Sequence, residues 1–154
     1  MRDESQGPVD PVAAIEYEQM LLSRYAIARH RGDHGPERSA YLFMSRIQLQ
    51  GPMTIAELGR AFRLETSTVQ RQAAAAVRAG LLERIPDPRG GAAMTYDCTD
   101  EGVRKLEASR TRSVRALHVI LADWSDEDIA AFAHQLGRFN ASIEDYNRRK
   151  SDTE

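Results

Sequence analysis

The sequence contains very little cysteine and no long apolar segment. Cys98 is the one cysteine among 154 residues, so it has no partner for a disulfide within the chain and cannot build a cysteine-rich zinc site. No apolar run approaches the roughly 18–20 residues that cross a bilayer, and the N-terminus lacks the apolar core of a secretory signal. We therefore expect no membrane association and a reducing, cytoplasmic environment.

Signatures of catalysis are missing as well. The chain has no glycine-rich phosphate loop, no nucleophile motif and no pair of acids in a pocket-forming pattern. The acidic run at residues 126–128 is explained by helix-start chemistry, because acids are favourable in the first turn of a helix. These absences predict a protein that is not an enzyme and that carries no cofactor.

Charge gives a weak indication of the partner. The net charge of the whole chain is −2, whereas residues 51–98 hold six arginines and five acids, a net +1. Residues 99–154 hold nine basic and eleven acidic side chains, a net −2. The middle of the chain is thus the least negative part, although a contrast of this size decides little by itself.

Hydrophobic periodicity and turn residues divide the chain into helices and one hairpin. Pro11 suits the first turn of a helix, Gly32–Pro36 form a break, and Gly51-Pro52 end the second helix. Thr54, with Glu57 three residues later, predicts a capping box. The expected helices are residues 11–31, 37–49, 54–62, from Thr66 or Ser67 to 79, 100–122 after a Thr99 cap, and from a Ser125 cap into the charged tail; the expected strands are residues 81–86 and 94–99.

The central segment has the layout of a winged helix-turn-helix. Two short helices joined by Arg63-Leu64-Glu65 precede a glycine stop at Gly80 and a hairpin whose tip reads Asp87-Pro88-Arg89-Gly90-Gly91. We expect Ala56 to let the two helices approach closely. The predicted fold is mainly α with a small β-hairpin wing, flanked by N- and C-terminal helices. The side chains expected between the short helices are Leu58, Leu64, Val69 and Val77.

A helical wheel of the second short helix separates a buried face from an outward one. With Val69 inward, Ala73 and Ala76 lie within about 40° of it at 100° per residue. Arg71 points roughly opposite, among short side chains that do not hold the backbone away from a groove. This face therefore suits the major groove of DNA, which is wide enough to admit a helix.

Several side chains near this face have the chemistry to bind DNA. Arg71 can pair with guanine O6 and N7, and Gln70 and Gln72 beside it can read adenine. The hydroxyls at the helix N-terminus lie where a phosphate is favoured, and Arg89 at the hairpin tip is predicted to enter the minor groove. The predicted DNA-binding residues are therefore Ser67, Thr68, Gln70, Arg71, Gln72, Arg78 and Arg89.

On these residues the chain resembles the MarR family of bacterial transcription regulators. The resemblance spans residues 12–148 and is carried by TIAELGRAF, STVQRQAAAAVRAGLLER, the Asp-Pro-Arg of the hairpin and the TDEG that opens the next helix. It implies a homodimer that places two recognition helices in the major groove of a pseudo-palindromic operator. By the same resemblance, the DNA-facing residues are Ser67, Thr68, Gln70 and Arg71, with Arg89 on the wing. Family wings often carry several basic residues after this arginine, whereas Gly90–Ala93 follow here, so we expect a short, flexible and weakly charged wing.

The outer helices are predicted to build the dimer. A winged domain of about 45 residues does not need three further amphipathic helices for its own core, so their apolar stripes need a partner. Two linked modules would space the recognition helices by about one DNA turn, roughly 34 Å. The predicted domains are a flexible arm (1–10), a helical dimerisation region (11–50 and 99–148), the winged DNA-binding domain (51–98) and a charged tail (149–154).

A pocket for a small aromatic effector is the remaining candidate site. In MarR proteins effectors often bind between the dimer helices and the winged domain. The resemblance therefore implies a crevice in this chain, although the same side chains would serve as core in a protein without a ligand. The residues that would line it are Tyr17, Tyr25, His30, Tyr41, Phe43 and Met44.

Metal binding and redox sensing are not expected. His30 and His34 are four residues apart, a spacing that suits a helical metal site, but Gly32 lies between them. Cys98 has Asp97 and Asp100 as neighbours, and nearby negative charge raises the pKa of a thiol. We therefore expect solvated histidines and an unreactive cysteine.

The sequence thus predicts a sequence-specific DNA-binding regulator, a ligand-responsive repressor that acts as a homodimer. The alternative is a winged-helix protein-interaction module that does not read DNA. Replacing Arg71 with alanine separates the two, because only a DNA-reading helix would lose about 1–3 kcal/mol of binding free energy.

Overall fold

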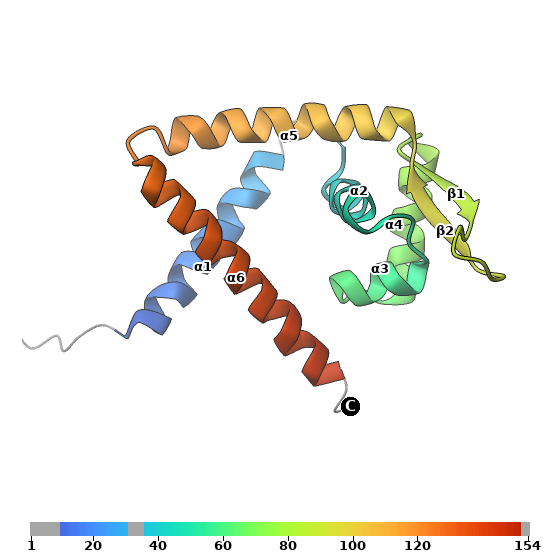
Figure 1. The fold of residues 1–154 in the computed structure, drawn as a ribbon, viewed down its shortest axis with the longest axis horizontal. Coiled ribbons are helices and arrows are strands. Elements are labelled where there is room, and N and C mark those ends of the chain that lie inside the picture. Colours follow the sequence, from blue (N-terminus) through green and yellow to red (C-terminus); the bar gives the residue numbers. More distant parts are fainter. Residues whose placement is uncertain (1–9, 31–35, 152–154) are drawn as a thin grey trace, which may run out of the picture. The chain divides into compact units, whose positions relative to one another are not determined.

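The computed structural model describes residues 10–30 and 36–151, without the side chains of residues 26–30 and 151. Within this part of the chain lie six helices and one two-stranded antiparallel sheet (Figure 1), which confirms the predicted fold class. None of the described helices is long and apolar enough to cross a membrane. In chain order the elements are α1 (Pro11–His30), α2 (Arg38–Gln50), α3 (Ile55–Phe62), α4 (Thr66–Arg78), β1 (Leu82–Pro86), β2 (Met94–Cys98), α5 (Asp100–Ile120) and α6 (Asp126–Ser151).

Packing divides the chain into two compact units, Met1–Ser109 and Arg110–Glu154. The core of the first unit draws on α2, α3, α4, the hairpin and the start of α5, so α2 and Leu106 belong to the winged unit. The sequence had placed both outside residues 51–98, because amphipathic stripes do not say which partner they meet. The core residues are Ala40, Phe43, Met44, Ile47, Met53, Leu58, Val69, Ala73, Ala76, Leu81, Leu82 and Leu106.

The start of α3 is the predicted capping box. The backbone N–H of Glu57 donates to Oγ1 of Thr54 at 3.2 Å, and the N–H of Thr54 donates to Oε2 of Glu57 at 2.7 Å. Two of the four N–H groups that a helix start leaves without partners are thereby satisfied. Such a cap contributes about 1 kcal/mol of stability.

Gly59, rather than Ala56, provides the close approach in the helix-turn-helix. A Cβ atom at Gly59 would lie 3.1 Å from the carbonyl oxygen of Leu64 and 3.8 Å from Cγ2 of Val69. The chain turns at Arg63, whose φ of 51° is left-handed, and this turn brings Leu64 back onto the last turn of α3. Ala56 lies in the first turn and is exposed, so the prediction for Ala56 was wrong.

The C-terminal end of α4 agrees with the prediction, whereas its N-terminal end differs from it. The N-cap is Glu65, so Thr66 and Ser67, the two predicted caps, are already helical and neither of them is the cap. At the C-terminus, Gly80 has a φ of 72° and its N–H donates to the carbonyl of Val77, while the N–H of Leu81 donates to that of Ala76. This Schellman arrangement confirms the predicted glycine stop. Val77 itself is 37% exposed instead of filling the interior.

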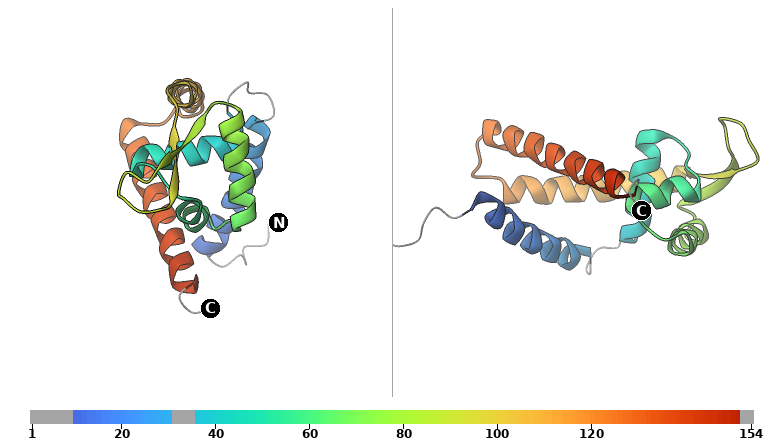
Figure 2. Two further views of the ribbon diagram at one scale, coloured as in Figure 1. Left: turned by 90° about the vertical axis from the view of Figure 1, so that its right-hand side faces the viewer. Right: turned by 90° about the horizontal axis from the view of Figure 1, so that it is seen from below.

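The hairpin forms the wing of the first unit. Leu82 lies opposite Cys98 and Pro86 opposite Met94, so each strand is one residue shorter than predicted. Met53, just before α3, adds a bridge to β2 in which its N–H and carbonyl pair with those of Tyr96 at 3.1 and 2.8 Å. Figure 2 shows the hairpin projecting beyond the helices of this unit. The bridge therefore fastens the base of the wing to the segment that leads into α3.

The second unit consists of the later part of α5 and of α6. The predicted Ser125 cap is present. The N–H of Asp128 donates to Oγ of Ser125 at 3.1 Å, and the hydroxyl of Ser125 donates to Oδ2 of Asp128 at 2.6 Å. Trp124 packs edge-on against Phe132 with ring centroids 5.5 Å apart. Much apolar surface nevertheless remains exposed in a single chain. The large exposed side chains are Val114, Leu117, Val119, Ile120, Trp124, Phe132, Leu136, Phe139, Ile143 and Tyr146.

Candidate nucleic-acid interface

The outward face of α4 is the first part of the candidate interface. Val69 and Ala73 have no exposed area and Ala76 is 3% exposed, so these three residues fix which side of the helix faces the core. Arg71 and Arg78 lie on the opposite side and are exposed. Neither arginine side chain has a hydrogen bond or ion pair with any other described residue. Arg71 is thus presented to solvent, with the half-buried Ala74 and Ala75 beside it.

Gln72 does not belong to this outward face. Its side chain is half-buried, and its Oε1 atom is buried without a hydrogen-bond partner in the described part of the chain. The reason is helical geometry: Gln72 lies about 60° from Val69 at 100° per residue, on the core side rather than beside Arg71. The predicted adenine contact of Gln72 therefore conflicts with its position, whereas Gln70 is exposed.

The N-terminus of α4 offers backbone donors next to this face. Glu65 makes no side-chain cap bond, and the first turn contains no acidic residue. Ser67 is exposed and Thr68 half-buried. The first N–H groups of a helix have no intrahelical acceptor and favour an anion such as phosphate. Ser67 and Thr68 thus lie in the first turn of α4, although neither serves as a cap.

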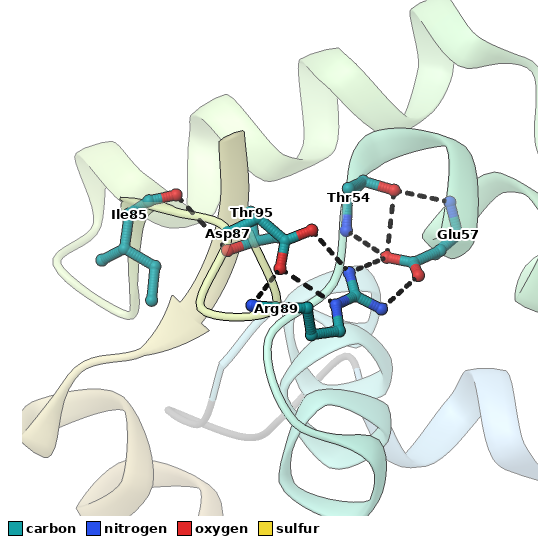
Figure 3. A network of polar contacts seen from close by, with 6 residues as sticks. All are labelled: Thr54, Glu57, Ile85, Asp87, Arg89 and Thr95. Atoms are coloured by element: carbon teal, nitrogen blue, oxygen red, sulfur yellow. Dashed lines mark hydrogen bonds and ion pairs between the residues drawn. The ribbon is translucent and has the colours of Figure 1, made fainter. Parts of the chain in front are cut away.

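Arg89, at the tip of the wing, is engaged within the protein. Its Nη1 donates to Oε1 of Glu57 at 2.7 Å and its Nη2 to Oε2 at 3.1 Å. Its Nε donates to Oδ1 of Asp87 at 2.9 Å, and Nη2 also reaches Oδ2 at 3.1 Å. Figure 3 shows the guanidinium between the two carboxylates, with Thr54 next to Glu57. Arg89 thus points at the start of α3, and not freely into solvent as a minor-groove contact would require.

The charges of this cluster reinforce one another. Hydrogen bonds from Arg89, and then the N–H of Thr54, lower the pKa of Glu57 to about 2. The same guanidinium lowers the pKa of Asp87, and the two carboxylates raise the pKa of Arg89, with Glu57 the larger cause. All three groups are therefore charged near neutral pH, and the cluster carries a net charge of −1.

The residues predicted for an effector pocket do not share one environment. Met44 and Phe43 are 0% and 1% exposed and belong to the core of the first unit, so a ligand would have to open that core to reach them. Tyr41 is partly buried against the same core. Tyr17 and Tyr25 on α1 are 60% and 58% exposed. The side chain of His30 lies outside the described residues.

Cys98 is the last residue of β2 and is partly buried. Burial, followed by the charge of Asp97, raises the pKa of Cys98 to about 11, and its Sγ lies 3.7 Å from the carbonyl oxygen of Met44. The sequence identified the acidic neighbour, but burial is the larger cause. No group of three or more metal-ligating side chains occurs among the described residues. His34 lies outside the described residues.

Sequence reasoning missed the partner of Arg89. The Thr54–Glu57 motif predicts the capping box, and Asp87-Pro88-Arg89 predicts the turn. However, 32 residues separate Glu57 from Arg89 in the sequence. No local pattern pairs residues so far apart. The contact arises because the hairpin folds back beside the start of α3.

The chain is similar to known proteins in both sequence and fold. A family model described as MarR family matches residues 34–93. An uncharacterized HTH-type transcriptional regulator of Bacillus subtilis, YxaD, is 31% identical over 139 residues, covering 88% of this chain and 97% of that protein. Streptococcus pneumoniae FabT in complex with DNA has a TM-score of 0.69 at 16% identity, covering 89% of this chain and 99% of FabT. PcaV of Streptomyces coelicolor in complex with its natural ligand has a TM-score of 0.61 at 20% identity, covering 93% and 98%.

Proposed function

Because the chain belongs to the MarR family of transcriptional regulators, we propose that it is a repressor that binds a pseudo-palindromic operator as a homodimer and responds to a small aromatic ligand. The observation that carries the proposal is the outward face of α4, where Arg71 is exposed and has no partner among the described side chains. Blocking a promoter needs only occupancy of the DNA, so repression is the simplest outcome of such binding.

DNA recognition follows from the side chains on and beside this face. The forked donors of Arg71 match guanine O6 and N7, and the amide of Gln70 matches adenine. Ser67, Thr68 and the N–H groups of the first turn of α4 suit a phosphate, which would fix the register of the helix in the groove. Arg78, also exposed, adds positive charge for the backbone.

The apolar surface of the second unit supports a homodimer. Phe132, Leu136 and Phe139 are 47%, 37% and 37% exposed in a single chain, and apolar side chains at this spacing form a continuous helical stripe. A second copy of α5 and α6 would cover it. Sedimentation equilibrium should therefore give a dimer at micromolar concentration, and a monomer would contradict this part of the proposal.

Ligand response is proposed as a shift between dimer conformations. A ligand that binds one spacing of the two recognition helices more tightly would favour it, and a spacing that does not match the groove repeat would release the DNA. Tyr17 and Tyr25 are exposed aromatic side chains in α1 that can contact an aromatic ring, and the structurally similar PcaV was solved with its natural ligand. Met44 is not part of the proposed ligand site because it lies in the core.

A gel-shift experiment tests the proposal. The probe is the DNA directly upstream of the gene for this protein, with a shuffled duplex of the same composition as control. We expect a shift of the upstream duplex at lower protein concentration than the control, and reversal by one or more members of a panel of aromatic acids. No shift at low salt, where phosphate contacts are strongest, would contradict DNA binding and favour the protein-interaction alternative. A shift that no panel member reverses would count against an aromatic acid as the ligand.

A further inference from the structure

The guanidinium of Arg89 has little capacity left for another partner. Its Nε, Nη1 and Nη2 atoms all donate to carboxylates, in a bidentate contact with Glu57 and a second contact with Asp87. The backbone N–H of Arg89 also donates to Oδ1 of Asp87 at 2.9 Å. Four hydrogen bonds from one side chain hold it in a single orientation, although the side chain remains 55% exposed.

Glu57 connects this contact to the framework of the helix-turn-helix. Its Oε2 accepts the N–H of Thr54 at 2.7 Å and the hydroxyl of Thr54 at 3.0 Å, while both carboxylate oxygens accept from Arg89. One carboxylate therefore caps α3 and binds the tip of the wing. Moving the wing would break the contact with Arg89 but leave the cap in place.

Charge also argues against Arg89 as a direct DNA contact in this arrangement. The two carboxylates outweigh the one guanidinium, so the cluster presents a net negative charge to a phosphate backbone. If Arg89 left for a groove, Glu57 and Asp87 would lose their neutralising partner near the DNA. Arg84, on β1 of the same hairpin, is exposed and has no ion pair with a described residue. Arg84 is therefore a suitable comparison for Arg89, since it has the same charge but binds no described carboxylate.

We propose that Glu57 is a wing-positioning residue: it binds Arg89 and thereby fixes the tip of the hairpin against the start of α3. Arg89 then supports DNA binding by holding the wing in place and not by touching DNA. The second half of this inference rests on the proposed function, whereas the anchoring of the wing does not.

The first test uses variants that separate charge from geometry. Glu57→Gln keeps a side chain that can complete the capping box but removes the anion. Arg89→Lys keeps the positive charge but loses the planar fork, and Arg89→Gln loses both. Arg84→Gln and Glu83→Gln are the matched controls, since each changes the same charge elsewhere on the hairpin. Amide hydrogen exchange of the free protein at Asp87, Arg89 and Gly90 then reports on the wing directly.

Positioning predicts the same result for all three variants of the pair. Exchange at these amides should rise by about fivefold, the loss expected for one good ion pair, and the double variant Glu57→Gln/Arg89→Gln should exchange no faster than Arg89→Gln alone. The two controls should leave exchange unchanged. Unchanged exchange in Glu57→Gln, or an increase that adds to that of Arg89→Gln, would overturn the anchor.

Binding to the upstream duplex tests the consequence for DNA. Positioning predicts that Glu57→Gln, Arg89→Lys and Arg89→Gln each weaken binding by a similar factor, about fivefold, with the salt dependence of the wild type. A direct contact predicts instead that Arg89→Gln lowers the salt slope by about one ion, that Arg89→Lys stays close to wild type, and that Glu57→Gln binds as well or better. If the wild type does not bind at all, the proposed function fails, and the exchange data still decide whether Glu57 anchors the wing.

Discussion

Gly102 touches the backbone of Leu81: a Cβ atom at Gly102 would collide with the carbonyl oxygen of Leu81 and lie 2.9 Å from its carbonyl carbon. The N–H of Thr99 donates to the same oxygen at 3.1 Å, and the hydroxyl of Thr99 donates to the carbonyl of Gly80 at 2.6 Å. Thr99 Oγ1 also accepts the N–H of Gly102 at 2.9 Å, which caps α5. The start of α5 is therefore locked to the segment that ends α4.

Gly102→Ala should destabilise the protein strongly. The obstacle is backbone rather than a movable side chain, and overpacking of this kind costs about 1–3 kcal/mol or more. Urea unfolding should show the loss. Gly137→Ala in α6 is the control, because a Cβ atom there meets nothing within 4 Å and alanine is the better helix former by up to about 1 kcal/mol. Equal effects of the two substitutions would contradict the close approach of α5.

The two short helices should respond differently to loss of a hydroxyl. Thr54→Ala removes the cap of α3 and should cost about 1 kcal/mol of unfolding free energy. Ser67→Ala lies within α4, which has no side-chain cap, and should change stability by less than about 0.5 kcal/mol while weakening DNA binding. Thermal unfolding and gel shifts on the same pair of variants check both. A destabilisation by Ser67→Ala equal to that by Thr54→Ala would restore Ser67 as a cap.

Acidification should weaken the Glu57–Arg89 contact, because it protonates the carboxylate of Glu57. The pKa of Glu57 is lowered from 4.5 to about 2 in the folded protein, so this group stabilises the fold fully above pH 4.5 and loses that contribution as the pH falls toward 2. The stability difference between the wild type and Arg89→Gln should therefore be constant from pH 7 to pH 5 and shrink below it. Urea unfolding at pH 6, 4.5 and 3.5 measures this, and a difference that grows on acidification would contradict the assigned ion pair.

Local chemistry made much of the fold predictable. The Thr54–Glu57 capping box, the Gly80 stop and the Thr99 and Ser125 caps each depend on residues within five positions of one another, so a pattern in the chain carries the full information. The positions of Val69 and Arg71 on opposite faces of α4 follow from helical periodicity alone. These elements appear within one or two residues of where they were expected.

Contacts between distant segments were not predictable in the same way. Glu57 and Arg89, or Gly102 and Leu81, meet only once the hairpin and α5 have packed, and nothing in the neighbouring sequence marks the pairing. Gln72 is a different case. It was predicted to read adenine beside Arg71, although the helical wheel that places Arg71 outward places Gln72 near Val69. The assignment of α2 to the winged core required knowing which partner its apolar stripe meets.

The exposed Arg71 on α4 is the centre of the account, and one comparison tests it. Dissociation constants for the upstream duplex and for the shuffled duplex should be measured at one fixed salt concentration for the wild type, Arg71→Ala and Arg104→Ala, an arginine on α5 that is paired with Glu101. We predict that Arg71→Ala loses about 1–3 kcal/mol on the upstream duplex and much less on the shuffled one, while Arg104→Ala matches the wild type on both. Equal binding of the upstream duplex by Arg71→Ala and the wild type would contradict DNA readout by this helix.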